Sequence, residues 1–297
     1  MRTRATSFQL GLNTEMPAGL QRFLYQLRRN WSTLFGLGII LFFVLVAIFA
    51  PLLATHDPVA TNLDEQFQPP SLRHFFGTDE VGWDIYSRVI YATRVNFFIA
   101  MASVLTAIAV GVPLGGLTGY FSGRFDDIMM RILDAFQAFP PLILAMAVIA
   151  ALGRSIWLVI AVIAFLYFPS YLRVVRAEMK SKKESFYAEA ARSVGNPSYR
   201  LIFRHLLPNC LDPVLAQAPL NAGWAILVAA SLSFIGLGVP IPTPEWGSMI
   251  NDGVGGIVSG EWWISFFPGL TAMLAVLGFN LLSEGLRDIF DPKRMES

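Results

Sequence analysis

Six long apolar runs, nearly free of charged residues, constrain this chain more than any other feature of its sequence. A helix needs about 20 apolar residues to cross the hydrocarbon of a bilayer. The runs are continuous rather than alternating, which favours helices over the strands of a membrane barrel. The third run, 140–152, is short and must begin near Ile132 to cross. The predicted spans are Leu34–Ala54, Val95–Phe121, Ile132–Leu152, Ile156–Leu172, Pro213–Val239 and Ile264–Leu282.

The composition agrees with lipid as the solvent of these runs. Hydrophobic residues make up 55% of the 297-residue chain and charged residues 14%, whereas a soluble domain carries about a quarter charged residues. One soluble core cannot hide so much apolar surface. Within the second span, Gly111, Gly115 and Gly119 predict close approach to a neighbouring helix. The predicted fold class is therefore an all-α membrane protein with about six transmembrane helices.

The positions of lysine and arginine predict the orientation, because cytoplasmic loops carry an excess of both. Of the 22 such residues, the outer side holds only Arg73, Arg88, Arg94 and Arg154. Both termini are therefore predicted to be cytoplasmic. The chain then divides into a cytoplasmic segment 1–30, a first span with an outer loop 31–94, a membrane core 95–290 that contains the cytoplasmic loop 173–208, and a cytoplasmic tail 291–297.

Two sizeable outer loops, 56–94 and 240–263, are rich in proline, glycine and tryptophan. Tryptophan is enriched where a membrane meets water, because its ring is apolar and its N–H is polar. Trp246, Trp262 and Trp263 are therefore predicted to anchor the second outer loop at that interface.

The spans lack the groups on which several other membrane functions depend. A coupled secondary transporter needs ionisable groups inside the bilayer, and an intramembrane hydrolase needs a buried nucleophile with a base. His56, His74 and His205 fall in loops, far apart in the sequence and without metal-ligand spacing. We therefore expect no catalytic residue and no metal site. A secondary transporter, a channel and a polytopic membrane enzyme stay open as alternatives.

The chain also lacks a nucleotide cradle. A phosphate-binding loop needs a Gly-Lys pair, and none occurs here. If transport is active, the energy must come from another polypeptide, so we expect no cofactor on this chain. Cys210 is the single cysteine, which excludes an internal disulfide. The expected surroundings are a lipid bilayer, with no nucleic acid as a partner.

The most informative stretch of the cytoplasmic loop is a short predicted helix that begins at Phe186. Ser185 is a suitable N-cap, the alanines favour helix, Gly195 can close it in the left-handed conformation, and Pro197 prevents its continuation. Phe186, Ala190 and Val194 repeat every four residues and form one apolar stripe. Such a helix either docks into a groove of a partner protein or lies on lipid.

The charge pattern of this helix favours the partner protein. Glu189 stands at its centre, whereas helices on a membrane surface have bulkier apolar residues and a strongly basic face. Glu189 and Arg192 are three residues apart and are predicted to pair across one turn.

Several motifs together resemble one family of membrane proteins. Glu189-Ala190-Ala191, Gly195 and Leu207-Pro208 are similar to the "EAA" motif of ABC importer permeases, with His205 where an Ile is common. Across roughly residues 30–294 the chain resembles the "C"-type subunit of the dipeptide/oligopeptide/nickel branch. The other motifs that carry the resemblance are Phe76-Gly77-Thr78-Asp79, Gly82-Trp83-Asp84, Ser87-Arg88, Arg94, Ser233 to Gly238, Pro242 to Gly247, Phe267-Pro268-Gly269 and Gly285 to Asp288.

The resemblance implies a type I ABC importer permease with both ends in the cytoplasm, in a bacterial inner membrane. Its expected partners are a second, distinct permease subunit, two ATPase subunits that bind ATP and Mg²⁺, and a periplasmic substrate-binding protein. Di- and oligopeptides are the implied substrates, and nickel chelates, glutathione or another small solute are the alternatives.

The resemblance also implies roles for particular residues. The predicted ATPase-coupling residues are Phe186, Glu189, Ala190, Ala191, Gly195, Leu207 and Pro208. In the first outer loop, charged residues either contact partner proteins or form an internal charge network, and spaced opposite charges favour the network. The possible outer-loop contact residues are Gly77 and the four charged residues Asp79, Asp84, Arg88 and Arg94.

Overall fold

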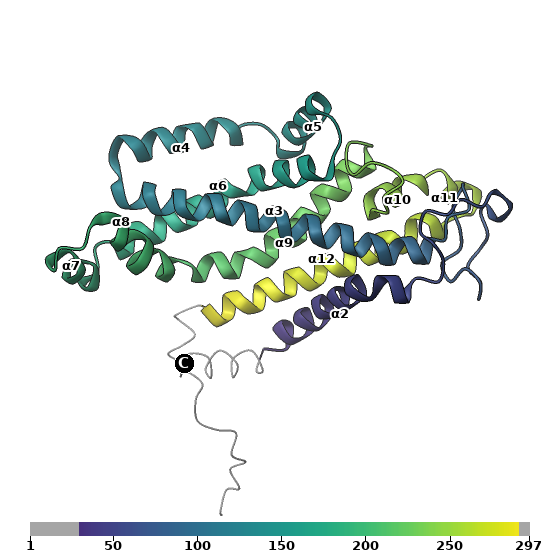
Figure 1. Cartoon of the computed structure of the whole chain (residues 1–297), viewed down its shortest axis with the longest axis horizontal. Coiled ribbons are helices and arrows are strands. Elements are labelled where there is room, and N and C mark those ends of the chain that lie inside the picture. The colour runs from purple at the N-terminus through teal and green to yellow at the C-terminus, as the bar shows by residue number, and fades with distance from the viewer. Residues whose placement is uncertain (1–29, 291–297) are drawn as a thin grey trace, which may run out of the picture.

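The computed structural model describes residues 30–290, which form helices joined by loops with no β-strand in this part of the chain (Figure 1). The predicted terminal segments up to residue 29 and from 291 onward lie outside the described residues. The all-α prediction is thus confirmed for this range. The α-helices are α2 (Trp31–Leu53), α3 (Ile85–Phe121), α4 (Gly123–Gln137), α5 (Pro141–Leu152), α6 (Ile156–Lys182), α7 (Phe186–Ser193), α8 (Ser198–Arg200), α9 (Asp212–Phe234), α10 (Trp246–Asp252), α11 (Gly256–Ser259) and α12 (Trp263–Phe290). Short turns of other helix types are η1 (Leu63–Glu65), η2 (Leu201–Leu206) and η3 (Leu207–Cys210).

Five helices are long and apolar enough to cross a membrane: α2, α3, α6, α9 and α12. The pair α4 and α5 is bent by 83°, and the count is six if this pair forms one broken span. The prediction of one continuous helix from Ile132 to Leu152 is wrong, because the chain leaves helical geometry between Gln137 and Pro141. Two consecutive prolines, Pro140 and Pro141, explain the break, since a residue that precedes proline is pushed away from the α conformation.

Two spans are longer than the apolar runs predict. Helix α3 begins at Ile85 rather than Val95, because the Asp84 carboxylate caps it by accepting from the Ser87 N–H at 2.8 Å. Helix α6 continues to Lys182, so the first part of the predicted loop 173–208 is helical. The expectation that this stretch is loop is wrong because no glycine or proline interrupts it, and its basic residues find acidic partners on α4.

The core is centred on α3, which packs closely along α6. The predicted role of the glycines in the second span is confirmed. A Cβ at Gly111, Gly115 or Gly119 would lie 2.6, 2.5 or 2.7 Å from a backbone carbonyl oxygen of α6. Only residues without a side chain allow two helix backbones to approach so closely. These two helices therefore form the closely packed centre of the molecule.

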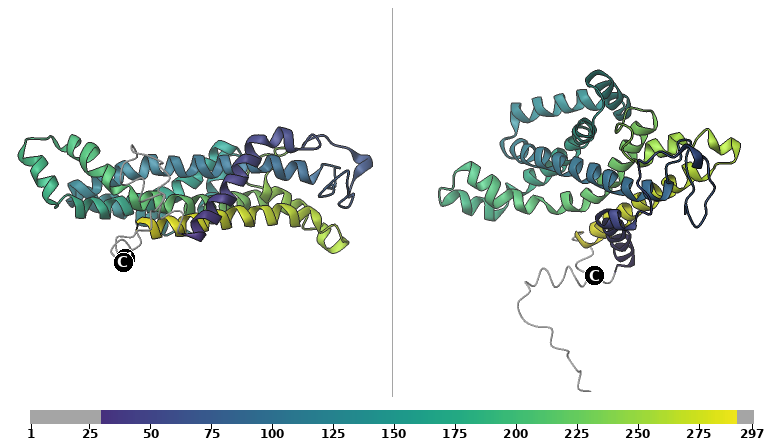
Figure 2. Two further views of the ribbon diagram at one scale, coloured as in Figure 1. Left: turned by 90° about the horizontal axis from the view of Figure 1, so that it is seen from below. Right: turned by 45° about the vertical axis from the view of Figure 1, so that its right-hand side comes forward.

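Helix α2 packs against α12 and turns its other side outward (Figures 1 and 2). Phe35, Phe42 and Ile48 of α2 are exposed, as expected for side chains that contact lipid. The molecule is elongated along its helices. Helices α7 and α8 lie at one end, and α10, α11 and the 54–84 loop lie at the other.

Candidate functional site

The short helix α7 has the local structure that its sequence predicts, with one difference at its start. Ser185 holds the N-cap position, but its hydroxyl donates to the Lys182 carbonyl at 2.6 Å instead of capping α7. Gly195 has φ +80°, which confirms the left-handed conformation. The Asn196 N–H then bonds to the Ala191 carbonyl at 3.3 Å, which closes the helix.

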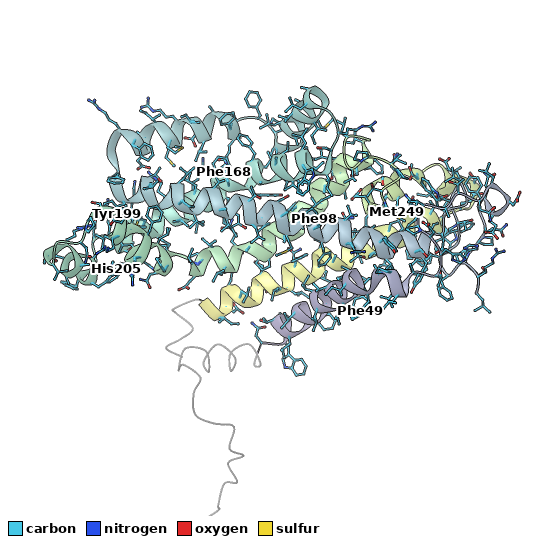
Figure 3. All side chains as sticks on the ribbon, viewed as in Figure 1. Phe49, Phe98, Phe168, Tyr199, His205 and Met249 are labelled. Atoms are coloured by element: carbon cyan, nitrogen blue, oxygen red, sulfur yellow. The ribbon has the colours of Figure 1, made fainter. Side chains whose placement is uncertain are left out.

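The predicted apolar stripe of α7 faces away from the rest of the chain. Phe186 is 91% exposed and Val194 is 79% exposed, and Ala190 between them is exposed as well. Ala188, on the opposite side, is fully buried. Figure 3 labels Tyr199, which lies at the same end of the molecule and is also exposed. Helix α7 therefore has an inner face that fixes it and an outer face with bulky apolar side chains.

Two basic side chains tie α7 to the C-terminal end of α3. The Lys183 ammonium, just before α7, donates to the Ser122 hydroxyl at 2.8 Å and to the Gly119 carbonyl at 3.3 Å. Arg192 donates to the Lys183 carbonyl at 2.9 Å, and its guanidinium lies 5.7 Å from the centre of the Tyr120 ring. A cation is favourable at a helix C-terminus because the terminal carbonyls there are unpaired.

The predicted pair of Glu189 with Arg192 is wrong for the described residues, which show no such ion pair. The reason is competition, because Arg192 reaches a backbone carbonyl that belongs to the fold. The Glu189 side chain is exposed and its carboxylate points to no basic partner within this part of the chain. It is therefore available to another molecule.

Leu207 and Pro208 lie where the segment that follows α7 approaches α3. A Cβ built on Gly116 of α3 would lie 2.9 Å from Leu207 Cδ1, so Leu207 is packed against that helix. Pro208 is the second residue of η3 and is exposed. Cys210 follows, and burial raises the pKa of its thiol to about 11, which makes it unreactive in the folded protein.

An ion-pair cluster around one buried carboxylate joins α6 to α4. The carboxylate of Asp126 is buried and accepts from Arg176 and, at 2.7 Å, from Lys180. Both basic residues belong to α6 and are four positions apart, so one helix face presents both to α4. The bent pair α4–α5 is thereby attached to the same helix that leads into α7.

At the opposite end, most of the predicted outer-loop residues are internal. Gly77 has φ +77°, and a Cβ there would lie 2.7 Å from the Trp263 ring. The Asp79 carboxylate accepts from the backbone N–H groups of Val81 and Trp83 at 3.0 and 2.9 Å, and burial raises its pKa. Arg88 is buried and donates to the Pro58 carbonyl at 2.8 Å.

These internal contacts favour the network within the loop over contacts with partner proteins, the two alternatives that the sequence allowed. Arg88 also lies over the Trp83 ring, with its guanidinium carbon 3.9 Å from the ring centre. Asp84 is buried and caps α3. Arg94 differs, because it is exposed beside the apolar side chains of Phe97 and Phe98 in a shallow pocket between α2 and α3. Arg94 alone of this set is open to a partner.

The tryptophan prediction is wrong for two of three residues. Trp246 is fully buried and donates to the Val89 carbonyl at 3.3 Å, and Trp263 is buried and donates to the Thr78 carbonyl at 3.2 Å. The indole N–H of each finds its acceptor in protein, because the two outer loops pack on one another. Trp262 is half exposed, which agrees with an interfacial position.

Sequence reasoning missed Glu245. Its side chain is fully buried, caps α10 by accepting from the Ser248 N–H at 3.0 Å, and lies near Asn96 of α3. Burial raises the pKa of this carboxyl group. No clear signal in the sequence indicated this role, because glutamate is not among the preferred N-cap residues.

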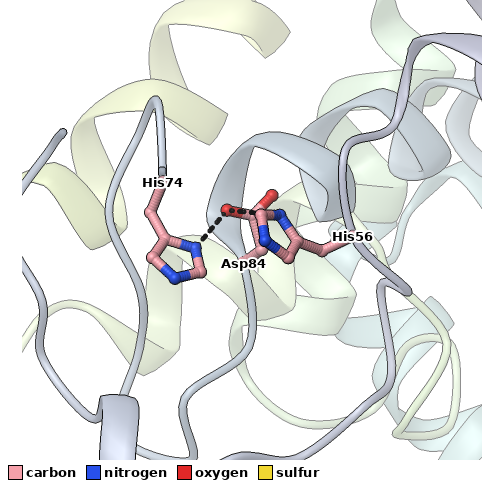
Figure 4. Close-up of side chains that lie close together, drawn as sticks. All are labelled: His56, His74 and Asp84. Carbon is pink, nitrogen blue, oxygen red and sulfur yellow. Dashed lines mark hydrogen bonds and ion pairs between the residues drawn. The ribbon is translucent and has the colours of Figure 1, made fainter. Parts of the chain in front are cut away.

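His56 and His74 lie in loops as expected, but they are close together in space although they are far apart in the sequence. His56 and His74 stack with ring centres 4.6 Å apart, and both face Asp84 (Figure 4). His205 lies in η2 near α7, at the other end of the molecule (Figure 3). Seventeen residues, 57–73, separate the two stacked histidines, so the spacing in the sequence did not indicate the contact.

The described residues thus combine long apolar helices with an exposed short helix at one end and two packed loops at the other. Residues 111–296 match the family model of the binding-protein-dependent transport system inner membrane component, and the chain belongs to this family. It is accordingly a multi-pass inner-membrane protein and a permease subunit of such a transport system. Residues 20–70 match the N-terminal transmembrane domain of oligopeptide transport permease C, which supports the predicted "C"-type resemblance.

Curated relatives match over nearly the whole chain. The dipeptide transport system permease protein DppC of Alkalihalophilus pseudofirmus is 42% identical over 268 residues, which cover 90% of this chain and 88% of that protein. The probable D,D-dipeptide transport system permease protein DdpC of Escherichia coli is 40% identical, with 92% and 91% covered. The di/tripeptide transport system permease protein DppC of Pseudomonas aeruginosa is 39% identical, with 93% of each chain covered.

Proposed function

We propose that this chain forms half of the translocation path of an ATP-driven importer for di- and oligopeptides. We assign ATPase coupling to α7 and to the residues around it. The observation that carries the proposal is the exposed stripe of Phe186, Ala190 and Val194 on a helix that is fixed to the membrane core on its other side. An apolar face of this kind on a polar end of the molecule is suited to a groove on a partner.

The mechanism follows from how α7 is attached. When two ATPase subunits close around ATP, a helix seated in one of them moves with it. The Lys183 and Arg192 contacts transmit this movement to the C-terminal end of α3, and Leu207 transmits it to Gly116 near the same end of that helix. Because α3 packs closely on α6, the two move as one unit. ATP must favour one state of the permease by several kcal/mol to shift the population.

The proposed partners supply what this chain lacks. The ATPase subunits bind ATP and Mg²⁺, a periplasmic binding protein delivers substrate to the outer end, and a second, distinct permease completes the path. The exposed apolar residues of the bent pair α4–α5 support a partner inside the membrane. They include Ile128, Ile132, Phe136, Phe139 and Ile143. The cytoplasmic position of α7 rests on the distribution of lysine and arginine.

The peptide substrate is supported by the printed functions of three relatives, which are named as transporters of dipeptides, D,D-dipeptides and di/tripeptides. Nickel chelates, glutathione or another small solute stay as alternatives, because the binding protein does most of the selecting in such systems. The measurement that separates them is the affinity of the cognate binding protein for each solute, followed by uptake of that solute into vesicles that contain the whole transporter.

The coupling assignment is tested by Glu189→Lys. An exposed carboxylate that contacts the ATPase becomes repulsive when its charge is reversed, so we expect loss of ATPase recruitment or of substrate-stimulated ATP hydrolysis. Glu80→Lys is the matched control, since Glu80 is also exposed but lies in the outer loop. Normal recruitment and uptake by Glu189→Lys would remove α7 from the mechanism.

A secondary transporter is the remaining alternative from a different class. It would move solute down an ion gradient without any ATPase. Purified chain in proteoliposomes with an imposed proton gradient tests this directly. Uptake under those conditions would overturn the proposal, whereas uptake that requires ATP and all four partner subunits supports it.

A further inference from the structure

The outer-loop layer brings three potential metal ligands to one point. His56 follows the end of α2, His74 lies in the loop before α3, and Asp84 is the N-cap of α3 (Figure 4). One donor atom from each lies within 4.8 Å of the other two. His74 Nδ1 is 2.9 Å from Asp84 Oδ1, and His56 Nδ1 is 3.7 Å from the same oxygen.

These distances suit a small tetrahedral metal site. With donors about 2.0–2.1 Å from a zinc ion, the donor atoms of neighbouring ligands lie about 3.3 Å apart. The two observed separations, 2.9 and 3.7 Å, stand on either side of this value. The donor atoms of His56 and His74 lie within 4.8 Å of each other, and because the two rings stack at 27°, one imidazole must rotate before both nitrogens can face the same ion.

Neighbouring groups hold Asp84 and His74 in place. Asp84 Oδ2 accepts from the Ser87 N–H at 2.8 Å, which leaves Oδ1 for the shared point. His74 Nε2 is buried without a hydrogen-bond partner, yet Glu65 Oε2 lies 3.5 Å from it. A carboxylate behind the outer nitrogen of a metal-binding histidine fixes its tautomer and strengthens it as a ligand.

The remaining contacts leave room for binding and access. The Thr55 hydroxyl lies 3.0 Å from His56 Nδ1 and 3.5 Å from the Ser87 hydroxyl, so it keeps a partner when His56 turns to a metal. The side chain of His56 is 35% exposed, whereas those of His74 and Asp84 are nearly covered. An ion can therefore reach the site from the outer surface past His56.

We propose that His56, His74 and Asp84 bind one divalent transition-metal ion on the outer face of the protein, with Zn²⁺ as the ion that the ligands fit best. Two imidazoles and one carboxylate favour zinc and its neighbours over Mg²⁺ and Ca²⁺, which prefer oxygen ligands. Three protein ligands leave one position for water or for a donor from a bound partner. The ion would join the exit of α2, the 71–77 loop and the start of α3.

The experiment uses the full-length chain with a histidine-free affinity tag, reconstituted in nanodiscs and treated with a chelator before zinc is added back. We expect about one tightly bound zinc ion per chain after gel filtration, measured by atomic emission. His56→Gln and His74→Gln should lose it, and His205→Gln should keep it because His205 lies at the other end of the molecule. Absence of bound zinc in the unmodified chain, or its retention in both of the first two variants, overturns the proposal.

A footprint on the unmodified chain tests the site even if a variant fails to fold. Diethyl pyrocarbonate modifies exposed imidazoles, and His56 and His205 are each partly exposed. Zinc should slow the modification of His56 and leave that of His205 unchanged, and Mg²⁺ should protect neither. Equal modification of His56 with and without zinc rejects the site.

Discussion

Replacing Phe186 with alanine separates a docking role of α7 from a structural one. The Phe186 side chain is 91% exposed, so its removal takes almost no packing away from the isolated chain. Substitutions of this kind change stability by less than about 0.5 kcal/mol. If the ring enters a groove on the ATPase, the same change removes a buried aromatic side chain from the complex.

The magnitude follows from the area that becomes available. Full burial of a phenylalanine side chain is worth about 1.5–3 kcal/mol, so its loss should raise the dissociation constant of the ATPase subunits roughly 10- to 100-fold. We expect a loss in this range for Phe186→Ala. Phe35→Ala is the matched control, because Phe35 is 66% exposed but lies on α2, away from α7.

The assay has two parts. Surface plasmon resonance of ATPase subunits on nanodiscs gives the dissociation constant. A thiol-reactive dye during heating gives the stability of the chain alone, because the only cysteine, Cys210, is buried until the protein unfolds. Unchanged ATPase affinity would refute the docking argument. A drop in the melting temperature of the isolated Phe186→Ala chain would show instead that the residue supports the fold.

Three further predictions concern glycine geometry and a buried acid. Gly195→Val should cost about 1–2 kcal/mol locally and reduce coupled ATP hydrolysis, because its φ is +80° and the strain comes from its own backbone; Gly195→Asn should be milder, since asparagine tolerates this region. Gly115→Leu should overpack the contact between α3 and α6, destabilise the folded chain by about 1–3 kcal/mol or more, and so lower the melting temperature measured with the Cys210 dye. Gly38→Ala should leave the melting temperature unchanged, because a Cβ there meets nothing within 4 Å. Burial raises the pKa of Glu245 in the folded state, so the folded protein binds this proton more tightly and stability should fall as pH rises above the ordinary pKa of 4.5. Glu245→Gln should reduce this dependence of the melting temperature on pH, as measured by tryptophan fluorescence. The same dependence in both proteins would contradict the reasoning.

Hydropathy predicted the five long apolar helices but not the break between α4 and α5. It succeeds for the five because a backbone in lipid must satisfy its own hydrogen bonds, and a helix does so locally. The short helix α7 was also predictable, since alanines, Gly195 and Pro197 act within a few residues of one another. The start of α3 at Ile85 was less accessible, because ten polar or mixed residues precede its apolar run and their helical state depends on the Asp84 cap.

Other features depended on contacts between distant segments. The burial of Trp246 and Trp263 requires the two outer loops to pack together, and hydropathy cannot distinguish that from contact with a membrane surface. The partner of Arg192 is a carbonyl nine residues away rather than the carboxylate one turn earlier. The stacking of His56 on His74 likewise depends on how the segment after α2 packs against the loop before α3. Local chemistry thus determined which helices form, whereas long-range packing determined which polar groups meet, because each such group takes whichever partner the folded chain brings within reach.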